Sequence, residues 1–344
     1  MPSLESVKLA LGRAELSDEA LCFISCNFEH FASKIKEFQI TLRLPKLNNS
    51  AINTFADCAL AHMTNLENLD LEFYSEKDHI VEPAVLVNLF DKMKNCVKKL
   101  KDFSFSTFDL NLPLEAIQAL TTNVFPNLSS LTFLFLGLER NNLTDSEFTL
   151  FFSGLKGVLK EVRYFGLVIK EPVLSDQSFD YLWTNILPQL KSLWGFICYV
   201  DGNGKMNDET FIKFNKSFQK VASQITSFTL AFENIGISNK GVKEFALKTL
   251  AELKRLKTLD INFGGAAGVK DEGMADLFDG LRGIIGRLRS LKLDLQRTGI
   301  TDVGIEAIKK RKDLDVWKKC SLDISGNEIS QENQSFVNKY FNKE

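Results

Sequence analysis

The sequence predicts an α/β solenoid in which about eleven strand–helix units share one continuous parallel sheet. An apolar phrase recurs at near-constant spacing through the 344 residues, each phrase alternates like a strand, and each is followed by signals that open a helix. The clearest copy is 288–308, in which Leu291 and Leu293 alternate with polar residues and Thr301 is placed to cap a helix. Because units of one strand and one helix cannot pair antiparallel, the strands must run parallel with right-handed crossovers. The expected shape is a horseshoe with the strands on its concave face.

The units follow from the first apolar residue of each phrase. These residues are Leu4, Ile35, Leu66, Leu100, Leu128, Leu159, Leu190, Ile225, Leu256, Leu288 and Trp317. Each phrase is apolar at its first, fourth, sixth and usually eighth places, which is typical of a half-buried strand. A polar turn and a helix opener come next, as in Thr144 and Glu147, which have capping-box spacing. We therefore expect one domain over 1–344, closed by a polar capping helix at 331–344.

Composition excludes several classes of protein. The chain is 44% hydrophobic and 25% charged with a formal net charge of −2, so no overall field attracts nucleic acid. The first residues lack the order of a signal peptide, and no apolar run reaches the roughly 18 residues of a membrane span. Six scattered cysteines favour a reducing compartment over a disulfide framework. We expect a cytoplasmic protein with protein partners, no nucleic acid and no membrane insertion.

Two motifs carry a family resemblance. Leu-x-x-Leu-x-Leu, a turn and then Ile-x-Asp-x-Gly (Ile300, Asp302 and Gly304) resemble the leucine-rich repeat of the ribonuclease-inhibitor-like type. The extended strand and a turn longer than the usual one are similar to the variant abundant in ciliate proteins. The resemblance covers 4–341. It departs from the family at the turn asparagine, which only Asn327 and, loosely, Asn142 supply.

This resemblance implies binding in place of catalysis. A chain made almost wholly of repeats is expected to be an adaptor or a structural subunit of a multi-protein complex. Repeat proteins of this type occur among axonemal linkers, so a cilium or cytoskeleton role is the more specific expectation. The alternative is a regulator of an enzyme, because such repeats include a nuclease inhibitor and activators of the Ran GTPase. Those activators usually carry an acidic tail, which 338–344 lacks, and the inhibitor would need a strongly acidic inner wall.

Residues between the apolar places of each strand should point into the concave face. Read this way, the middle units present apolar side chains with polar residues on either side, as a protein-binding surface does. The predicted contact residues are Leu134, Arg163, Phe165, Trp194, Phe196, Asp260 and Asp294. The alternative is a register slip in 162–168 and 193–199, because Gly166 and Gly195 otherwise fall at core places. Trp194 and Phe196 would then be buried.

The sequence offers little for metal binding or catalysis, and we expect no cofactor and no enzyme activity. Cys26, His30, Cys58 and His62 form a weak candidate for zinc, since each pair is four residues apart on consecutive predicted helices. The alternative is that the cysteines pack as small apolar residues. The loop 201–208 lacks the oxygen ligands of a calcium site. The three histidines lie in the first quarter of the chain, and no Gly-x-Ser-x-Gly elbow is present.

Overall fold

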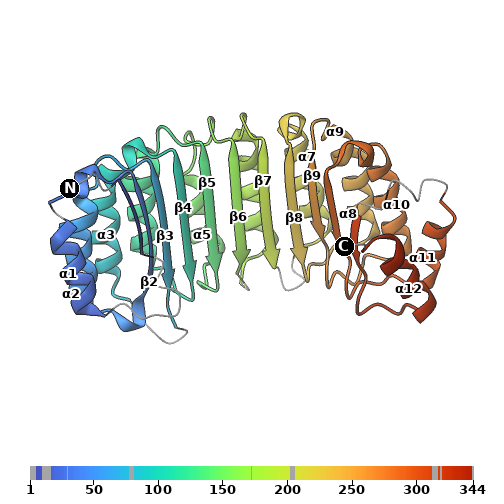
Figure 1. Ribbon diagram of the computed structural model, residues 1–344, viewed down its shortest axis with the longest axis horizontal. Helices are drawn as coiled ribbons and strands as arrows, with labels where there is room; N and C mark the ends of the chain where they lie inside the picture. The colour runs from blue at the N-terminus through green and yellow to red at the C-terminus, as the bar shows by residue number, and fades with distance from the viewer. Residues whose placement is uncertain are drawn as a thin grey trace. The chain divides into compact units, whose positions relative to one another are not determined.

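The computed structural model describes residues 5–9, 17–28, 30–76, 81–171, 173–201, 206–311, 317 and 320–342. It divides into two compact units, Met1–Val173 and Leu174–Glu344. We call them the N-terminal unit and the C-terminal unit and describe each by itself (Figure 1).

The N-terminal unit contains a parallel sheet whose strands follow one another in chain order. Its strands are β1 (Ser6–Leu9), β2 (Glu37–Arg43), β3 (Asn68–Tyr74), β4 (Asp102–Phe108), β5 (Phe133–Glu139) and β6 (Tyr164–Lys170). Its helices are α1 (Asp18–Phe28), α2 (Asn49–Thr54), α3 (Pro83–Cys96), α4 (Leu114–Ala119) and α5 (Asp145–Ser153). A π-helical turn extends α2 over Phe55–Ala59 and α4 over Leu120–Val124. Short 3-10 turns occupy Ala32–Lys34, Leu44–Lys46, Leu60–His62, Val97–Lys99 and Phe125–Asn127.

The C-terminal unit has the same alternation of strands and helices, and its neighbouring strands also pair parallel. Its strands are β7 (Gly195–Asp201), β8 (Ser227–Glu233), β9 (Thr258–Asn262), β10 (Ser290–Asp294) and β11 (Cys320–Asp323). Its helices are α6 (Asp176–Tyr181), α7 (Asp208–Gln219), α8 (Asn239–Glu244), α9 (Leu250–Glu252), α10 (Asp271–Arg282), α11 (Asp302–Lys309) and α12 (Gln331–Tyr340). π-Helical turns at Leu182–Ile186 and Phe245–Thr249 follow α6 and α8. Short 3-10 turns occupy Leu187–Gln189, Ala222–Gln224 and Ile285–Arg287.

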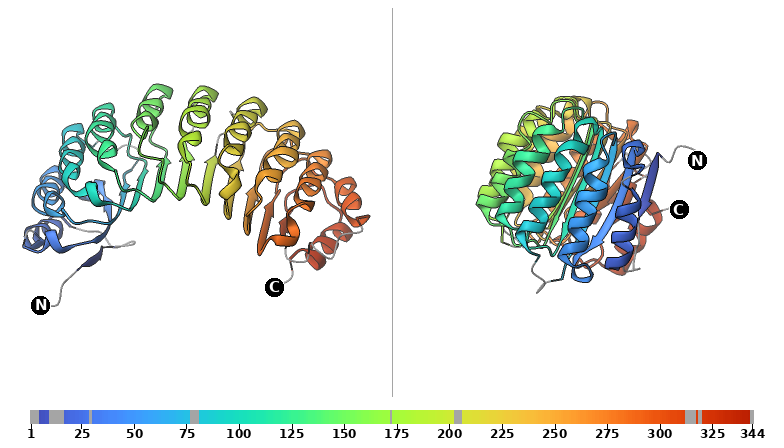
Figure 2. Two further views of the ribbon diagram at one scale, coloured as in Figure 1. Left: turned by 90° about the horizontal axis from the view of Figure 1, so that it is seen from above. Right: turned by 90° about the vertical axis from the view of Figure 1, so that its left-hand side faces the viewer.

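The core of each unit lies between its sheet and its helices. Strand residues alternate between this core and the opposite side, and much of the core is built from phenylalanine. In the N-terminal unit, the rings of Phe73, Phe90 and Phe105 contact one another with centroids 5.9 to 6.5 Å apart. The helices cover one face of each sheet and leave the other uncovered (Figure 2). We call this uncovered side the open face; it is the side that the sequence predicts to be concave.

The Ile-x-Asp-x-Gly motif connects neighbouring repeats of the C-terminal unit. Asp271, the first residue of α10, accepts hydrogen bonds from the backbone N–H and the hydroxyl of Thr301 in the next repeat, at 2.8 and 2.7 Å. A Cβ atom at Gly304 would lie 2.5 Å from Asp271 Oδ1. Asp208 binds Ser238 in the same way, at 2.8 and 2.6 Å. The aspartates at the starts of α7 and α10 thus accept hydrogen bonds from the cap residue of the following helix, and Gly241 and Gly304 leave room for them.

The structure confirms parallel β-α repeats but corrects the register of three of them. The predicted starts at Leu128, Leu159 and Leu190 are wrong, although all three residues are buried in the connections before the strands. The first apolar places of these repeats are Leu131, Val162 and Leu193, each buried three residues further on. Counted from Leu100, the spacings then become 31, 31 and 31 residues, followed by 32 to Ile225. A shift of three is odd, so it moves every strand side chain to the opposite face.

Candidate functional site

The open face of the N-terminal unit is built from rows of side chains that cross the strands. One row is Glu37, Asn68, Asp102, Phe133 and Tyr164, and the next is Lys8, Gln39, Asp70, Ser104, Phe135 and Gly166. Each residue lies one strand spacing, about 4.8 Å, from its neighbour in the row. The face thus changes from charged and polar on β2–β4 to aromatic on β5 and β6.

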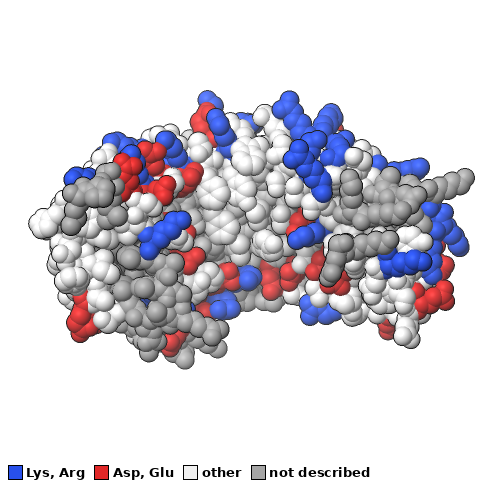
Figure 3. All heavy atoms as spheres, viewed as in Figure 1, with Lys and Arg blue, Asp and Glu red and all other residues white. Residues whose placement is uncertain are grey.

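Phe133, Phe135 and Tyr164 form what we call the aromatic shelf. The rings of Phe133 and Tyr164 stack with centroids 4.8 Å apart and planes 7° from parallel. Phe135 lies over Gly166, where an added Cβ would approach Phe135 Cδ2 to 2.3 Å. All three side chains are half-buried. In Figure 3 the middle of the face over β5 and β6 is free of charged atoms.

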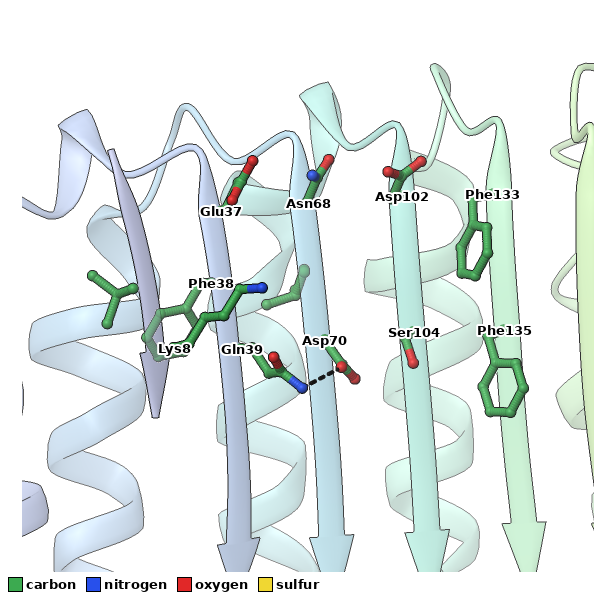
Figure 4. Close-up of a pocket in the computed structure, with 12 residues that line it drawn as sticks. Lys8, Glu37, Phe38, Gln39, Asn68, Asp70, Asp102, Ser104, Phe133 and Phe135 are labelled. Carbon is green, nitrogen blue, oxygen red and sulfur yellow. Dashed lines mark hydrogen bonds between the residues drawn. The ribbon is translucent and has the colours of Figure 1, made fainter. Parts of the chain in front are cut away.

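A hollow of about 280 Å³ lies beside the aromatic shelf. Its lining includes Lys8, Asp70 and Asp102 on one side and Phe133 and Phe135 on the other (Figure 4). Asp70 Oδ2 accepts a hydrogen bond of 2.9 Å from Gln39 Nε2. Burial raises the pKa of both the Asp70 and the Asp102 carboxyl, and this effect outweighs the neighbouring donors and lysines that lower it.

Stacked rings and an ion pair occupy the same face at the C-terminal ends of β3–β6. The Tyr74 and Phe108 rings stack at 4.2 Å and 3°, and the Arg43 guanidinium lies 5.4 Å from the Tyr74 ring centroid. Lys170 Nζ pairs with Glu139 at 3.0 Å. Here an acidic and a basic side chain pair with each other, whereas three carboxylates and one lysine line the hollow.

The C-terminal unit has its own acidic hollow of about 270 Å³ on its open face. Tyr199, Asp260, Lys292, Asp294 and Asp323 are among the lining residues. Tyr199 is 37% exposed, and burial of its hydroxyl, with Asp260 and Glu233 nearby, raises its pKa. Burial also raises the pKa of Asp260. An aromatic ring again borders carboxylates.

The corrected register decides where the predicted contact residues lie. Leu134, Phe165 and Phe196 are at most 2% exposed, so their prediction as surface contacts is wrong. They occupy the fourth place of repeats that begin at Leu131, Val162 and Leu193, and this place faces the core. The alternative of a slipped register was therefore correct for Phe196 and wrong for Trp194, which is 44% exposed.

Four further predicted residues lie at the surface. Arg163 and Trp194 are exposed at the residue before β6 and β7, where each strand begins, and not in the rows of the open face. Asp260 and Asp294 point onto the open face of the C-terminal unit and line its hollow. The role of these four residues in binding stays a prediction.

The residues that sequence reasoning missed are Phe133, Phe135, Tyr164 and Tyr199. A constant spacing of 31 residues between repeat starts, counted from Leu100, is the signal that would have placed them on the open face. It was obscured because Leu128 and Leu131, three residues apart, both fit the first place.

The candidate zinc ligands are not assembled. Within the described ranges, no group of three or more His, Cys, Asp or Glu side chains is arranged to hold a metal ion, so Cys26, His30, Cys58 and His62 do not form a site. Cys26 is exposed and Cys58 half-buried. His79 and residues 202–205 of the loop 201–208 fall outside the described residues.

Comparison with known proteins gives structural likeness but no sequence relative. No family model matches, and no curated protein does. The chain is similar to one in the crystal structure of the Rad7 and Elc1 complex in yeast, with a TM-score of 0.62 and 16% identity, over 95% of this chain and 71% of that one. The fold is a leucine-rich-repeat solenoid. An internalin from Listeria monocytogenes is 16% identical over 94% of this chain and 92% of its own, with a TM-score of 0.36, too low to bear on the fold.

In the part of the chain that the structure describes, none of the helices has the length and apolar character needed to cross a membrane.

Proposed function

We propose that this chain is a non-enzymatic protein-binding module that serves as an adaptor or structural subunit of a larger assembly. The observation that carries the proposal is the aromatic shelf of Phe133, Phe135 and Tyr164 on the open face. Aromatic side chains with a polar surround are the usual anchors of protein interfaces. The strand ladder fixes the backbone beneath them, so binding costs little ordering. The similar yeast structure is itself a complex of two proteins.

The repeat type and the cellular location are finer parts of the proposal. We assign the repeats to the ribonuclease-inhibitor-like type, supported by the Asp271, Thr301 and Gly304 arrangement of the Ile-x-Asp-x-Gly motif. We place the protein in the cytoplasm, with the cilium or axoneme as the specific site, on the resemblance to ciliate-type repeats alone. Imaging of the tagged chain in ciliated cells tests this, and exclusion from cilia would overturn it.

Affinity capture from native extract tests the binding function. We compare the wild-type chain with Phe135→Asp on the aromatic shelf and with Val303→Asp, which places the same charge on α11, where Val303 is 70% exposed. Proteins held by the open face should be captured by the wild type and by Val303→Asp and lost with Phe135→Asp. Capture that is equal for all three proteins would contradict the proposal.

Regulation of an enzyme is the second candidate, and the carboxylates of the two hollows favour it for a basic enzyme. If the captured partner is an enzyme, its activity with and without this chain separates the two functions. A change in activity indicates a regulator, and an unchanged activity indicates an adaptor.

A further inference from the structure

We infer that the hollow of the N-terminal unit receives an arginine side chain of the partner protein. Its guanidinium would face Asp70 and Asp102, and its stem would lie against Phe133 and Phe135. This rests on the proposed function and specifies the chemistry of the partner at that surface.

The shape of the hollow follows from residue size along the rows. Ser104 lies between Asp70 on β3 and Phe135 on β5, one strand from each. Because the Ser104 side chain is small, it leaves a depression between the Asp70 carboxylate on one side and the Phe135 ring on the other (Figure 4). Asp102 adjoins Phe133 in the neighbouring row. Asp102 lies one strand away from Asp70 and two residues along it, so the two backbone positions are about 8 Å apart, and one guanidinium can bridge the carboxylates between them.

The charges of the hollow are only partly compensated within the protein, by Lys8 near Asp70 and Lys101 near Asp102. Its lining includes the carboxylates of Glu37, Asp70 and Asp102 and a single basic group, Lys8. Gln39 and Ser104, the neighbours of Asp70 in its row, donate hydrogen bonds to its carboxylate, but both are neutral. A cationic donor in the hollow would offset the remaining cost of burying this charge.

The open faces of both units likewise carry more carboxylates than basic side chains. The open-face positions of the described strands include ten carboxylates and four basic side chains. The carboxylates are Glu37, Asp70, Glu72, Asp102, Glu139, Asp201, Glu233, Asp260, Asp294 and Asp323, and the bases are Lys8, Arg43, Lys170 and Lys292. The complete chain has 44 acidic and 42 basic residues, so the negative charge is concentrated on these faces. They therefore favour a basic partner.

Arginine fits this hollow better than lysine or a small molecule does. Its planar guanidinium stacks on aromatic rings and binds two acceptors, whereas a lysine ammonium is a compact, strongly hydrated charge. A volume of about 280 Å³ is slightly below the roughly 300–1,000 Å³ of small-molecule sites, which favours a side chain of a larger ligand.

The experiment uses the complete chain and two tripeptide probes, acetyl-Gly-Arg-Gly-amide and its citrulline analogue, which has nearly the same shape without the charge. Binding is measured by saturation-transfer NMR on the δ-methylene of the probe. We expect the arginine probe to bind about tenfold more tightly than the citrulline probe. Asp70→Asn/Asp102→Asn should abolish this difference.

The matched control is Glu115→Gln/Glu161→Gln, which removes the same charge from exposed positions outside the strands and should leave the preference intact. Melting temperatures confirm that each variant folds. Equal binding of both probes to the wild type, or a preference that survives in the Asp70/Asp102 variant, would overturn the inference. Because the capture experiment depends on Phe135 and needs no arginine probe, the proposed function can stand while this inference fails.

Discussion

At the scale of single residues, Gly166 determines how the aromatic shelf is formed. Its missing side chain leaves the space that the Phe135 ring occupies, since an added Cβ would come within 2.3 Å of Cδ2. The glycine looks out of place in the sequence, because it falls within a strand. The structure explains it as the floor beneath an aromatic ring that lies flat on the sheet.

We expect Gly166→Ala to lower the free energy of unfolding by about 1 kcal/mol or more, because overpacking forces the Phe135 ring off its position. In Gly166→Ala/Phe135→Ala the alanine at 166 should cost far less, since the ring is gone. Urea unfolding of the two single variants and the double variant measures this coupling. Strictly additive effects would show that the ring does not depend on the glycine.

Glu171 is a second residue whose role follows from its surroundings. It is 2% exposed, and its Oε1 accepts hydrogen bonds from Asn141 N and Nδ2 at 2.8 and 2.9 Å. Asn141 in turn donates to the carbonyl of Thr107 and accepts from the N–H of Leu110. The contacts connect three repeats. Burial raises the pKa of Glu171, although these hydrogen bonds partly oppose it.

A raised pKa makes this stability depend on pH. Above about pH 4.5, the ordinary value for glutamate, the unfolded chain releases the proton before the folded chain does. The wild type therefore loses stability as pH rises through the folded pKa. Glu171→Gln keeps the acceptor without this titration, so its stability relative to the wild type should increase from pH 4.5 to 7. Urea titrations at both pH values test this, and a pH-independent difference would contradict it.

At the scale of elements, hydrogen bonds between consecutive helix starts connect the repeats. Asp302 accepts from the backbone N–H and the hydroxyl of Ser330 at the start of α12, as Asp271 does from Thr301. At the end of the chain, Asn342 Oδ1 accepts from Leu322 N and its Nδ2 donates to Leu322 O, at 3.0 Å each. These bonds satisfy the backbone N–H and carbonyl of Leu322 on β11.

Asp271→Ala should lower the free energy of unfolding by about 2 kcal/mol, because it leaves two donors of Thr301 without their charged acceptor. The control is Asp276→Ala, which breaks a pair at 3.6 Å between the half-buried Asp276 and the exposed Lys243 and should cost less than about 1 kcal/mol. Amide exchange should accelerate in α11 for Asp271→Ala only. Similar losses for both variants would mean that the motif does not join the repeats.

The sequence predicts the repeats better than it predicts which strand side chains lie on the open face and which lie in the core. Parallel strands and helix caps at Thr144 and Thr301 follow from local patterns, and the structure has all of them. The face of a strand depends on register, and 133–138 reads Phe-Leu-Phe-Leu-Gly-Leu, apolar at nearly every place. Both alternations fit such a run. Only the length of the preceding repeats distinguishes the ring that is exposed from the leucine that is buried.

At the scale of the whole molecule, the central claim is that the helix side of each sheet stabilises the fold and the open face binds the partner. The helix side holds the packed apolar side chains of each repeat, while the open faces bear the aromatic shelf and more carboxylates than basic side chains. The acidic residues Asp260 and Asp294 could be placed on an open face from sequence. The hollows could not, because they depend on which side chains in adjacent rows are small.

Site-specific photo-crosslinking tests this claim most directly. p-Benzoylphenylalanine is placed at Tyr164 on the open face or at Leu247 on the helix side, where the native side chain is 49% exposed, and each protein is irradiated with the captured partner. We predict a crosslinked product from position 164 and none from position 247. Crosslinking from position 247 with none from position 164 would show that the partner binds the helices and that the account of the open face is wrong.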